Sequence, residues 1–143
     1  METREVVVNS GSGLGQTILT GPHLLQADEP VESGGQHTGP NPYELLLAAL
    51  GSSTSTTLRL YADHMAWPLE RVTVRLEHWK VQANTRGGGG EPVDEIKKVV
   101  FLVGDLTTEQ RDRLLEVARK CPVHRTLAKA VRICTRLGTG VLM

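Results

Sequence analysis

The feature that most constrains this fold is a helix without a polar face. The segment 41–44, Asn-Pro-Tyr-Glu, is typical of a helix start, because Asn can cap, Pro fits the first helical position and Glu follows the cap by three residues. From there to about Met65 only Gly51 interrupts the run, and residues 45–50 are all apolar. A helix that is apolar on every side is buried on every side. The chain must therefore surround this helix, or bury it against a second copy.

The remaining pattern predicts short strands and two further helices. Before the long helix we expect strands at 5–8, 16–20 and 22–27, a hairpin loop at 9–13 and a polar loop at 28–40. After it we expect a strand at 71–83 with a phase change near His78, a glycine-rich tip at 84–92, a strand at 94–103, helices from 107 and from 122 to about 130, and a last strand at 131–137.

The helix after residue 107 has clear signals at both ends. Thr107 and Gln110 form a capping box, and Pro122 ends the helix. Its inner face is expected to hold Leu114, Leu115, Val117 and Ala118. Hairpins combined with separate helices predict an α+β fold with an antiparallel sheet, and 143 residues suit one domain, 1–143.

Composition excludes several classes of protein. The 16 Lys and Arg balance 16 Asp and Glu, whereas a nucleic-acid protein needs surplus positive charge. No apolar run approaches the ~20 residues that cross a bilayer, and the first residues lack the apolar core of a signal peptide. Two cysteines make no disulfide scaffold. We therefore expect a cytoplasmic protein without nucleic-acid or membrane partners.

The first candidate for chemistry is the segment 121–124, Cys-Pro-Val-His. Because Pro122 fits the first helical position, Cys121 becomes the cap, and backbone N–H groups face its sulfur. With His124 and Arg125 one turn in, this arrangement lowers a thiol pKa and favours the thiolate. The alternative is a small buried cysteine beside a helix break. The residues alone leave both interpretations open.

The second candidate is a run of six hydroxyl residues, 52–57, inside the apolar helix. Ser and Thr compete for backbone hydrogen bonds, so such a run breaks the local rule for helices. Positions that break local rules are often functional or packing sites. The alternative is close packing against small side chains, with the hydroxyl groups bonded back to carbonyl groups.

Other site chemistry has less support in the pattern. Cys134 shares a face of the predicted last strand with two arginines, and we interpret it as a partly exposed bystander. The five histidines show no metal-ligand spacing, so we expect no metal and no cofactor. A serine hydrolase would need a GxSxG elbow, which is absent, and a Ser53–His124 dyad would have only Glu44 as an orienting acid.

Two segments together resemble the OsmC/Ohr family of small thiol-dependent peroxidases. They are 39–54, GPNPYELLLAALGSST, and 121–127, CPVHRTL. Their residues resemble a less characterised OsmC-like branch of the family more than its authenticated peroxidases. Element order and length are also similar over nearly the whole chain. The resemblance implies an α+β fold in which an intertwined homodimer wraps antiparallel sheets around central helices. It also implies active sites at the dimer interface.

The resemblance further implies a two-cysteine cycle. One cysteine, on the central helix, attacks the O–O bond of an organic hydroperoxide, becomes a sulfenic acid and condenses with the second cysteine, and a dithiol then reduces the disulfide. The second cysteine matches Cys121, but the attacking cysteine matches Ser53. A hydroxyl group is a poor nucleophile towards peroxide and forms neither a sulfenic acid nor a disulfide.

The other family site residues match less closely. No arginine lies between Arg4 and Arg59 to match the family's catalytic Arg, and the loop offers His37. By spacing, Tyr43 matches the position of the family's Glu at the start of the helix. Glu44 lies one position later and can act as a cap. The candidate catalytic residues are Ser53, Cys121 and Glu44, and the candidate substrate-binding residues are Tyr43, His37 and His124.

We therefore expect an OsmC-like redox protein related to organic hydroperoxide reductases, in which Cys121 is the surviving thiol. Peroxidase activity should be weak or absent if Ser53 is natural, and an engineered Ser53 would point to a two-cysteine parent. The expected partners are a second copy, an organic hydroperoxide or another hydrophobic small molecule, and a dithiol. One alternative is a non-catalytic module that binds a hydrophobic molecule at the dimer interface. Another is a hydrolase that uses Ser53 or Cys121.

Overall fold

The computed structural model describes residues 3–82 and 91–139. The chain divides into two compact units, which we call unit 1 (Met1–Ser52 and Thr73–Phe101) and unit 2 (Ser53–Val72 and Leu102–Met143). Three elements continue from one unit into the other: α1 (Pro42–His64), β4 (Leu69–Gln82) and β5 (Pro92–Gly104). The expectation of one domain over 1–143 stays a prediction, and the glycine-rich tip lies mostly outside the described residues.

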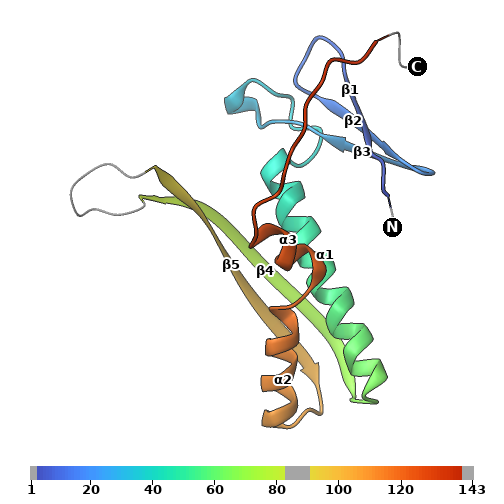
Figure 1. Ribbon diagram of the computed structural model, residues 1–143, viewed down its shortest axis with the longest axis vertical. Helices are drawn as coiled ribbons and strands as arrows, with labels where there is room; N and C mark the ends of the chain where they lie inside the picture. The colour runs from blue at the N-terminus through green and yellow to red at the C-terminus, as the bar shows by residue number, and fades with distance from the viewer. Residues whose placement is uncertain (1–2, 83–90, 140–143) are drawn as a thin grey trace. The chain divides into compact units, whose positions relative to one another are not determined.

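Unit 1 begins with a three-stranded antiparallel sheet in the order β1-β2-β3 (Figure 1). Its strands are β1 (Val7–Ser10), β2 (Gln16–Thr20) and β3 (His23–Ala27). Ile18 on the central strand pairs with Val8 on one side and with Leu25 on the other. The three expected strands are confirmed, with the first displaced by two residues. A short 3-10 helix, Val31–Ser33, lies in the loop that follows.

The start of α1 is held by a reciprocal cap. The Asn41 backbone N–H donates to Oε1 of Glu44 at 2.9 Å, and the Glu44 N–H donates to Oδ1 of Asn41 at 2.8 Å. Both partners of the predicted cap are therefore confirmed. The expected burial on all sides is not reached within one chain, because Leu50 is 4% exposed but Leu46 is 37% exposed. The described residues therefore leave part of the helix surface exposed.

The alternation along β4 corrects the expected phase change at His78. Half-buried positions continue at every second residue through His78, whereas Trp79 and Val81 are exposed. The pattern of apolar residues predicted a phase change because the polar residue His78 occupies a position on the half-buried face of β4. His78 Nε2 lies 2.8 Å from Oδ1 of Asp94, and its ring stacks on Tyr43 at 4.7 Å between centroids. These contacts give the imidazole its partners on the half-buried face.

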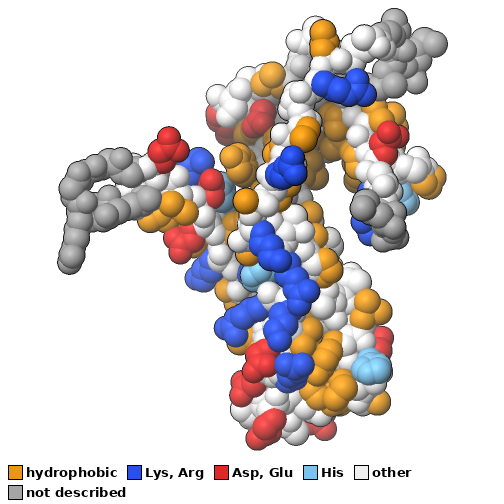
Figure 2. All heavy atoms as spheres, viewed as in Figure 1, with side chains coloured by type: hydrophobic (Ala, Val, Ile, Leu, Met, Phe, Trp, Pro, Cys, Tyr) orange, Lys and Arg blue, Asp and Glu red, His pale blue; other side chains and the backbone are white. Residues whose placement is uncertain are grey.

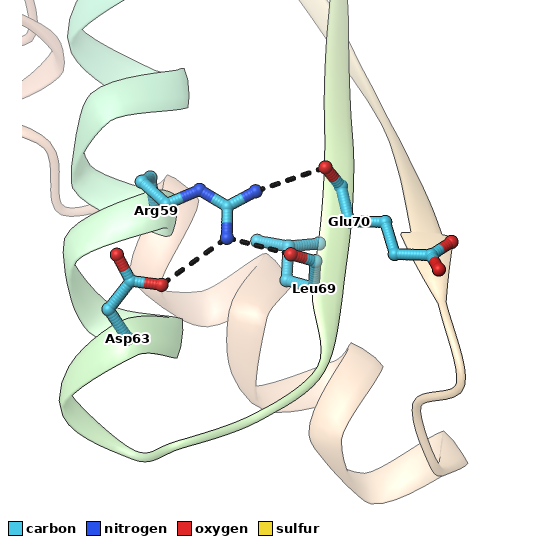
Figure 3. Close-up of polar contacts among 4 residues, drawn as sticks. All are labelled: Arg59, Asp63, Leu69 and Glu70. Carbon is cyan, nitrogen blue, oxygen red and sulfur yellow. Dashed lines mark hydrogen bonds and ion pairs between the residues drawn. The ribbon is translucent and has the colours of Figure 1, made fainter.

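In unit 2 the connection from α1 to β4 is fastened by one arginine (Figure 3). Nη1 of Arg59 donates to the Leu69 carbonyl oxygen at 2.7 Å, and Nη2 donates to the Glu70 carbonyl oxygen at 3.3 Å. The same guanidinium forms an ion pair with Asp63 at 3.3 Å. Because the guanidinium of this α1 residue binds two carbonyl groups at the start of β4, it fixes the position of that strand end against the helix.

The second helix, α2 (Thr108–Ala118), begins at the predicted capping box between Thr107 and Gln110. Leu114, Val117 and Ala118 are buried as expected, but Leu115 is 43% exposed, which corrects its placement on the inner face. Positions i, i+3 and i+4 share one helix face, and the residue after i turns away from it. The third helix, α3 (Pro122–Leu127), ends three residues before the expected position.

The expected last strand is wrong. Residues 131–137 form no strand, and Val131, Ile133 and Leu137 are 56%, 84% and 92% exposed. Alternating residues give a segment two distinct faces, but a strand also needs a neighbour for its backbone hydrogen bonds. Within the described residues no strand pairs with this segment. Across residues 3–82 and 91–139, no helix is long and apolar enough to cross a membrane.

Candidate functional site

The site in unit 2 is built around the sulfur of Cys121. Cys121 is the N-cap of α3, and its Sγ accepts a hydrogen bond from the His124 backbone N–H at 3.4 Å. Pro122 occupies the first turn, as the motif predicts. The side chain is completely buried, at 0% exposure. The predicted capping geometry is therefore present, in a position that solvent does not reach.

Two hydroxyl groups of α1 lie against the start of α3. Oγ1 of Thr54 lies 3.4 Å from Sγ of Cys121, and Oγ of Ser53 accepts a hydrogen bond from the Val123 N–H at 3.4 Å. Thr54 is 0% exposed and Ser53 is half-buried. The helix thus presents Ser53 and Thr54 to the helix start that carries Cys121.

Thr54 is a contact of Cys121 that the sequence analysis missed. The available signal was the hydroxyl run itself, because a Thr next to Ser53 belongs to the same motif. The run is not uniform in its role. Ser52 donates back to the Ala49 carbonyl oxygen at 3.2 Å, as the packing alternative expected, whereas the next two residues contact the segment 121–123.

The other three candidates, Tyr43, Glu44 and His37, belong to unit 1, whereas Ser53, Cys121 and His124 belong to unit 2. Glu44 caps α1, and Tyr43 is 52% exposed and stacks on His78. His37 is exposed and has a φ of 55°, an uncommon value for a residue with a side chain. The catalytic and binding roles of all six residues stay predictions.

Asp28 organises the loop that carries His37, and sequence reasoning did not single it out. The carboxylate is 3% exposed, and its Oδ2 accepts from the Thr38 hydroxyl at 2.8 Å and from the backbone N–H groups of Gln36 and Thr38 at 3.2 Å. Oδ1 accepts from the Glu29 N–H at 2.8 Å. These hydrogen bonds, above all that from the Thr38 hydroxyl, lower the pKa of Asp28.

A hollow of about 330 Å³ adjoins this loop in unit 1. Its lining is mainly glycine backbone and polar side chains, with Leu14 the one large apolar residue. The lining residues are Ser12, Gly13, Leu14, Gly15, Asp28, Gly34, Gly35, Gln36 and Thr38. This wall is polar, and the alternative of a hydrophobic-ligand module at the dimer interface stays a prediction.

Asp28→Asn is expected to weaken the acid sensitivity of folding. A carboxyl group whose folded pKa is depressed contributes stability above its unfolded pKa, and that stability is lost as the pH falls through the lower folded pKa. The variant removes this contribution, so its free energy of unfolding should be lower near neutral pH and fall less steeply in acid. Urea titrations across the acid range measure both. Glu32→Gln, at an exposed position of the same loop, is the control and should leave the slope unchanged.

Comparison with known proteins decides the family. Residues 34–136, more than half of the chain, match the family model described as OsmC-like protein. The chain belongs to the OsmC-like family. The matched range includes both segments on which the resemblance was based, together with Ser53 and Cys121. A comparison with curated proteins gives no match.

Solved structures support the OsmC-like fold. An OsmC-like protein from Mycoplasma pneumoniae superposes with a TM-score of 0.73 at 17% identity, covering 89% of this chain and 88% of that one. An organic hydroperoxide resistance protein OsmC from Legionella pneumophila gives 0.66 at 19%, covering 89% and 90%. The organic hydroperoxide resistance protein OhrB of Bacillus subtilis gives 0.60 at 20%, covering 87% and 90%. The predicted α+β fold with antiparallel sheets is confirmed.

Metal chemistry finds no ready ligand set in the described residues. Over 3–82 and 91–139, no group of three or more His, Cys, Asp or Glu side chains is placed to hold a metal ion. Both cysteines are present as thiols, Cys121 buried and Cys134 exposed. The described residues place a thiol beside hydroxyl groups, at Cys121, Thr54 and Ser53.

Proposed function

We propose that this OsmC-like protein is a redox protein related to thiol-dependent organic hydroperoxide reductases, in which Ser53 has removed the peroxide-attacking thiol. The observation that carries the proposal is the hydrogen bond from the Val123 N–H to Oγ of Ser53. It supports the idea that residue 53 faces the segment that begins with Cys121. The site then keeps its second thiol and lacks the first.

The residual chemistry is limited to one thiol. Attack of the Cys121 thiolate on a hydroperoxide would break the O–O bond, release an alcohol and leave a sulfenic acid on the sulfur. Because Ser53 cannot form a disulfide, an external dithiol would have to return the thiol, becoming a disulfide and releasing water. The sulfur is completely buried, so access of a hydroperoxide is expected to be slow. Weak or absent turnover follows.

The direct experiment supplies cumene hydroperoxide and dithiothreitol and follows the loss of peroxide. The chain with Ser53 is expected to consume little more peroxide than the dithiol alone. Cys121→Ser should abolish any excess, whereas Cys134→Ser, at the exposed cysteine, should leave it unchanged. Turnover at the rate of an ordinary thiol peroxidase would show that Ser53 does not disable the cycle, and would overturn the proposal.

We also propose that the protein acts as a homodimer in the cytoplasm. Support comes from apolar side chains that one chain leaves exposed on α1, Leu46 at 37% and Leu60 at 65%. Burying such side chains is favourable, at about 25 cal/mol per Å² of apolar surface. Light scattering at micromolar concentration should give twice the 15.6 kDa chain mass. A monomer would contradict the proposal.

A further inference from the structure

The charges of the chain are divided unevenly between its two units. Unit 2 contains ten Lys and Arg residues against six Asp and Glu, whereas unit 1 contains six against ten. The formal net charge of zero therefore combines a positive unit with a negative one. Local charge, and not the total, decides what a surface attracts at short range, because salt screens charges beyond about 10 Å.

The positive charge of unit 2 is concentrated at its C-terminal end. After Glu116 the sequence contains no acidic residue. Six Lys and Arg residues follow Ala118, and all are exposed. We call them the basic segment: Arg119, Lys120, Arg125, Lys129, Arg132 and Arg136. Figure 2 shows Lys and Arg side chains gathered over α3 and the residues beside it.

The fold uses other arginines of unit 2 and leaves the basic segment unused. Arg59 and Arg111 hold carbonyl groups of the strands, and Arg113 binds the hydroxyl of Tyr61 and the carboxylate of Glu116. By contrast, no side chain of the basic segment forms an ion pair with any residue in 3–82 or 91–139. Neighbouring like charges repel one another, so these six residues weaken the isolated fold.

We propose that the basic segment is a docking surface for an acidic protein. Complementary charge steers such partners together and selects among them. Arginine is enriched in protein interfaces, where it accompanies apolar groups, and Leu127 is 38% exposed between Arg125 and Lys129. The proposal goes beyond the peroxide chemistry and does not depend on it, because the surface exists whether or not Cys121 reacts.

Nucleic acid fits this surface less well. No Phe, Tyr or Trp follows Phe101 in the sequence, so the basic segment offers none of the larger aromatic rings on which bases stack.

The test measures the affinity of the full chain for fluorescent poly-L-glutamate by anisotropy, at low salt and at physiological salt. Arg119→Glu/Lys129→Glu reverses two charges of the basic segment and is expected to weaken binding by about tenfold or more, the equivalent of about 1.4 kcal/mol. The matched control, Arg71→Glu/Lys97→Glu, makes the same charge change at two exposed residues elsewhere. It should change the dissociation constant by less than about twofold.

Three outcomes would overturn the proposal. The first is no binding of poly-L-glutamate at low salt, and the second is equal weakening by the two double variants. The third is tighter binding to a DNA duplex of equal charge, which would assign the surface to nucleic acid. Circular dichroism of each variant shows whether it is folded. If Arg119→Glu/Lys129→Glu unfolds, the neutral variant Arg119→Gln/Lys129→Gln replaces it and is expected to weaken binding in the same direction.

Discussion

Ser53→Cys is expected to raise the rate of cumene hydroperoxide reduction on the order of a hundredfold, equivalent to about 2.7 kcal/mol of activation free energy. A thiol at this position supplies the nucleophile that the hydroxyl cannot, because only a thiolate attacks the O–O bond at neutral pH. The surrounding geometry is already present: residue 53 contacts the Val123 N–H, and Cys121 caps the same helix. Steady-state peroxide consumption with a dithiol measures the change.

Two variants control for a general effect of an added thiol. Thr56→Cys places the new sulfur on the same helix at an exposed position and should leave the rate near that of the unsubstituted chain. Ser53→Cys/Cys121→Ser keeps the attacking thiol and removes its partner, so it should form the sulfenic acid but turn over more slowly. If Ser53→Cys and Thr56→Cys gave equal rates, residue 53 would hold no special place in the site.

Gly104→Ala is expected to lower the free energy of unfolding by about 2 kcal/mol or more, the cost of a strained backbone with a forced contact. Gly104 lies in unit 2 at the end of β5, with a φ of 151°, and an added Cβ would overlap the carbonyl oxygen of Pro68. That atom belongs to the backbone, so no side-chain rotation relieves the overlap. The melting temperature should fall by about 5 °C or more.

The matched control for this change is Gly138→Ala. Apart from its chain neighbours, no heavy atom of the described residues lies within 4 Å of the position that its Cβ would take, so the melting temperature should hardly change. Calorimetry on the two variants compares the same substitution with and without a close backbone neighbour. Equal stability of both proteins would mean that the approach of Gly104 to Pro68 does not hold the strand end in place.

Much of the fold could be predicted because its signals are local. The Asn41–Glu44 cap and the Thr107–Gln110 capping box are hydrogen bonds within one helical turn, and both form. Cys121 caps α3 for the same reason, since Pro at the first helical position fixes the residue before it. Such interactions need no information about distant parts of the chain.

What the sequence could not supply depends on distant partners. The inner position of His78 requires Asp94 on the next strand. The segment 131–137 has the alternation of a strand, but no strand in 3–82 or 91–139 pairs with it. Within the candidate site, the family motif indicated Ser53 and Cys121, whereas the contact between Thr54 and the sulfur joins residues 67 positions apart. The uneven division of charge between the two units could not be predicted either, because the net charge of the chain is zero and the units were not known.

The most direct measurement of the central claim is a crosslink between residue 53 and Cys121. Ser53→Cys protein, treated with one equivalent of cumene hydroperoxide without a reductant, is expected to lose two hydrogens in intact mass. Peptide mapping should then show a disulfide that joins position 53 to Cys121. A stable sulfenic acid with no disulfide, or a bridge to Cys134 instead, would contradict the claim that the hydroxyl run of α1 and the start of α3 form one thiol site.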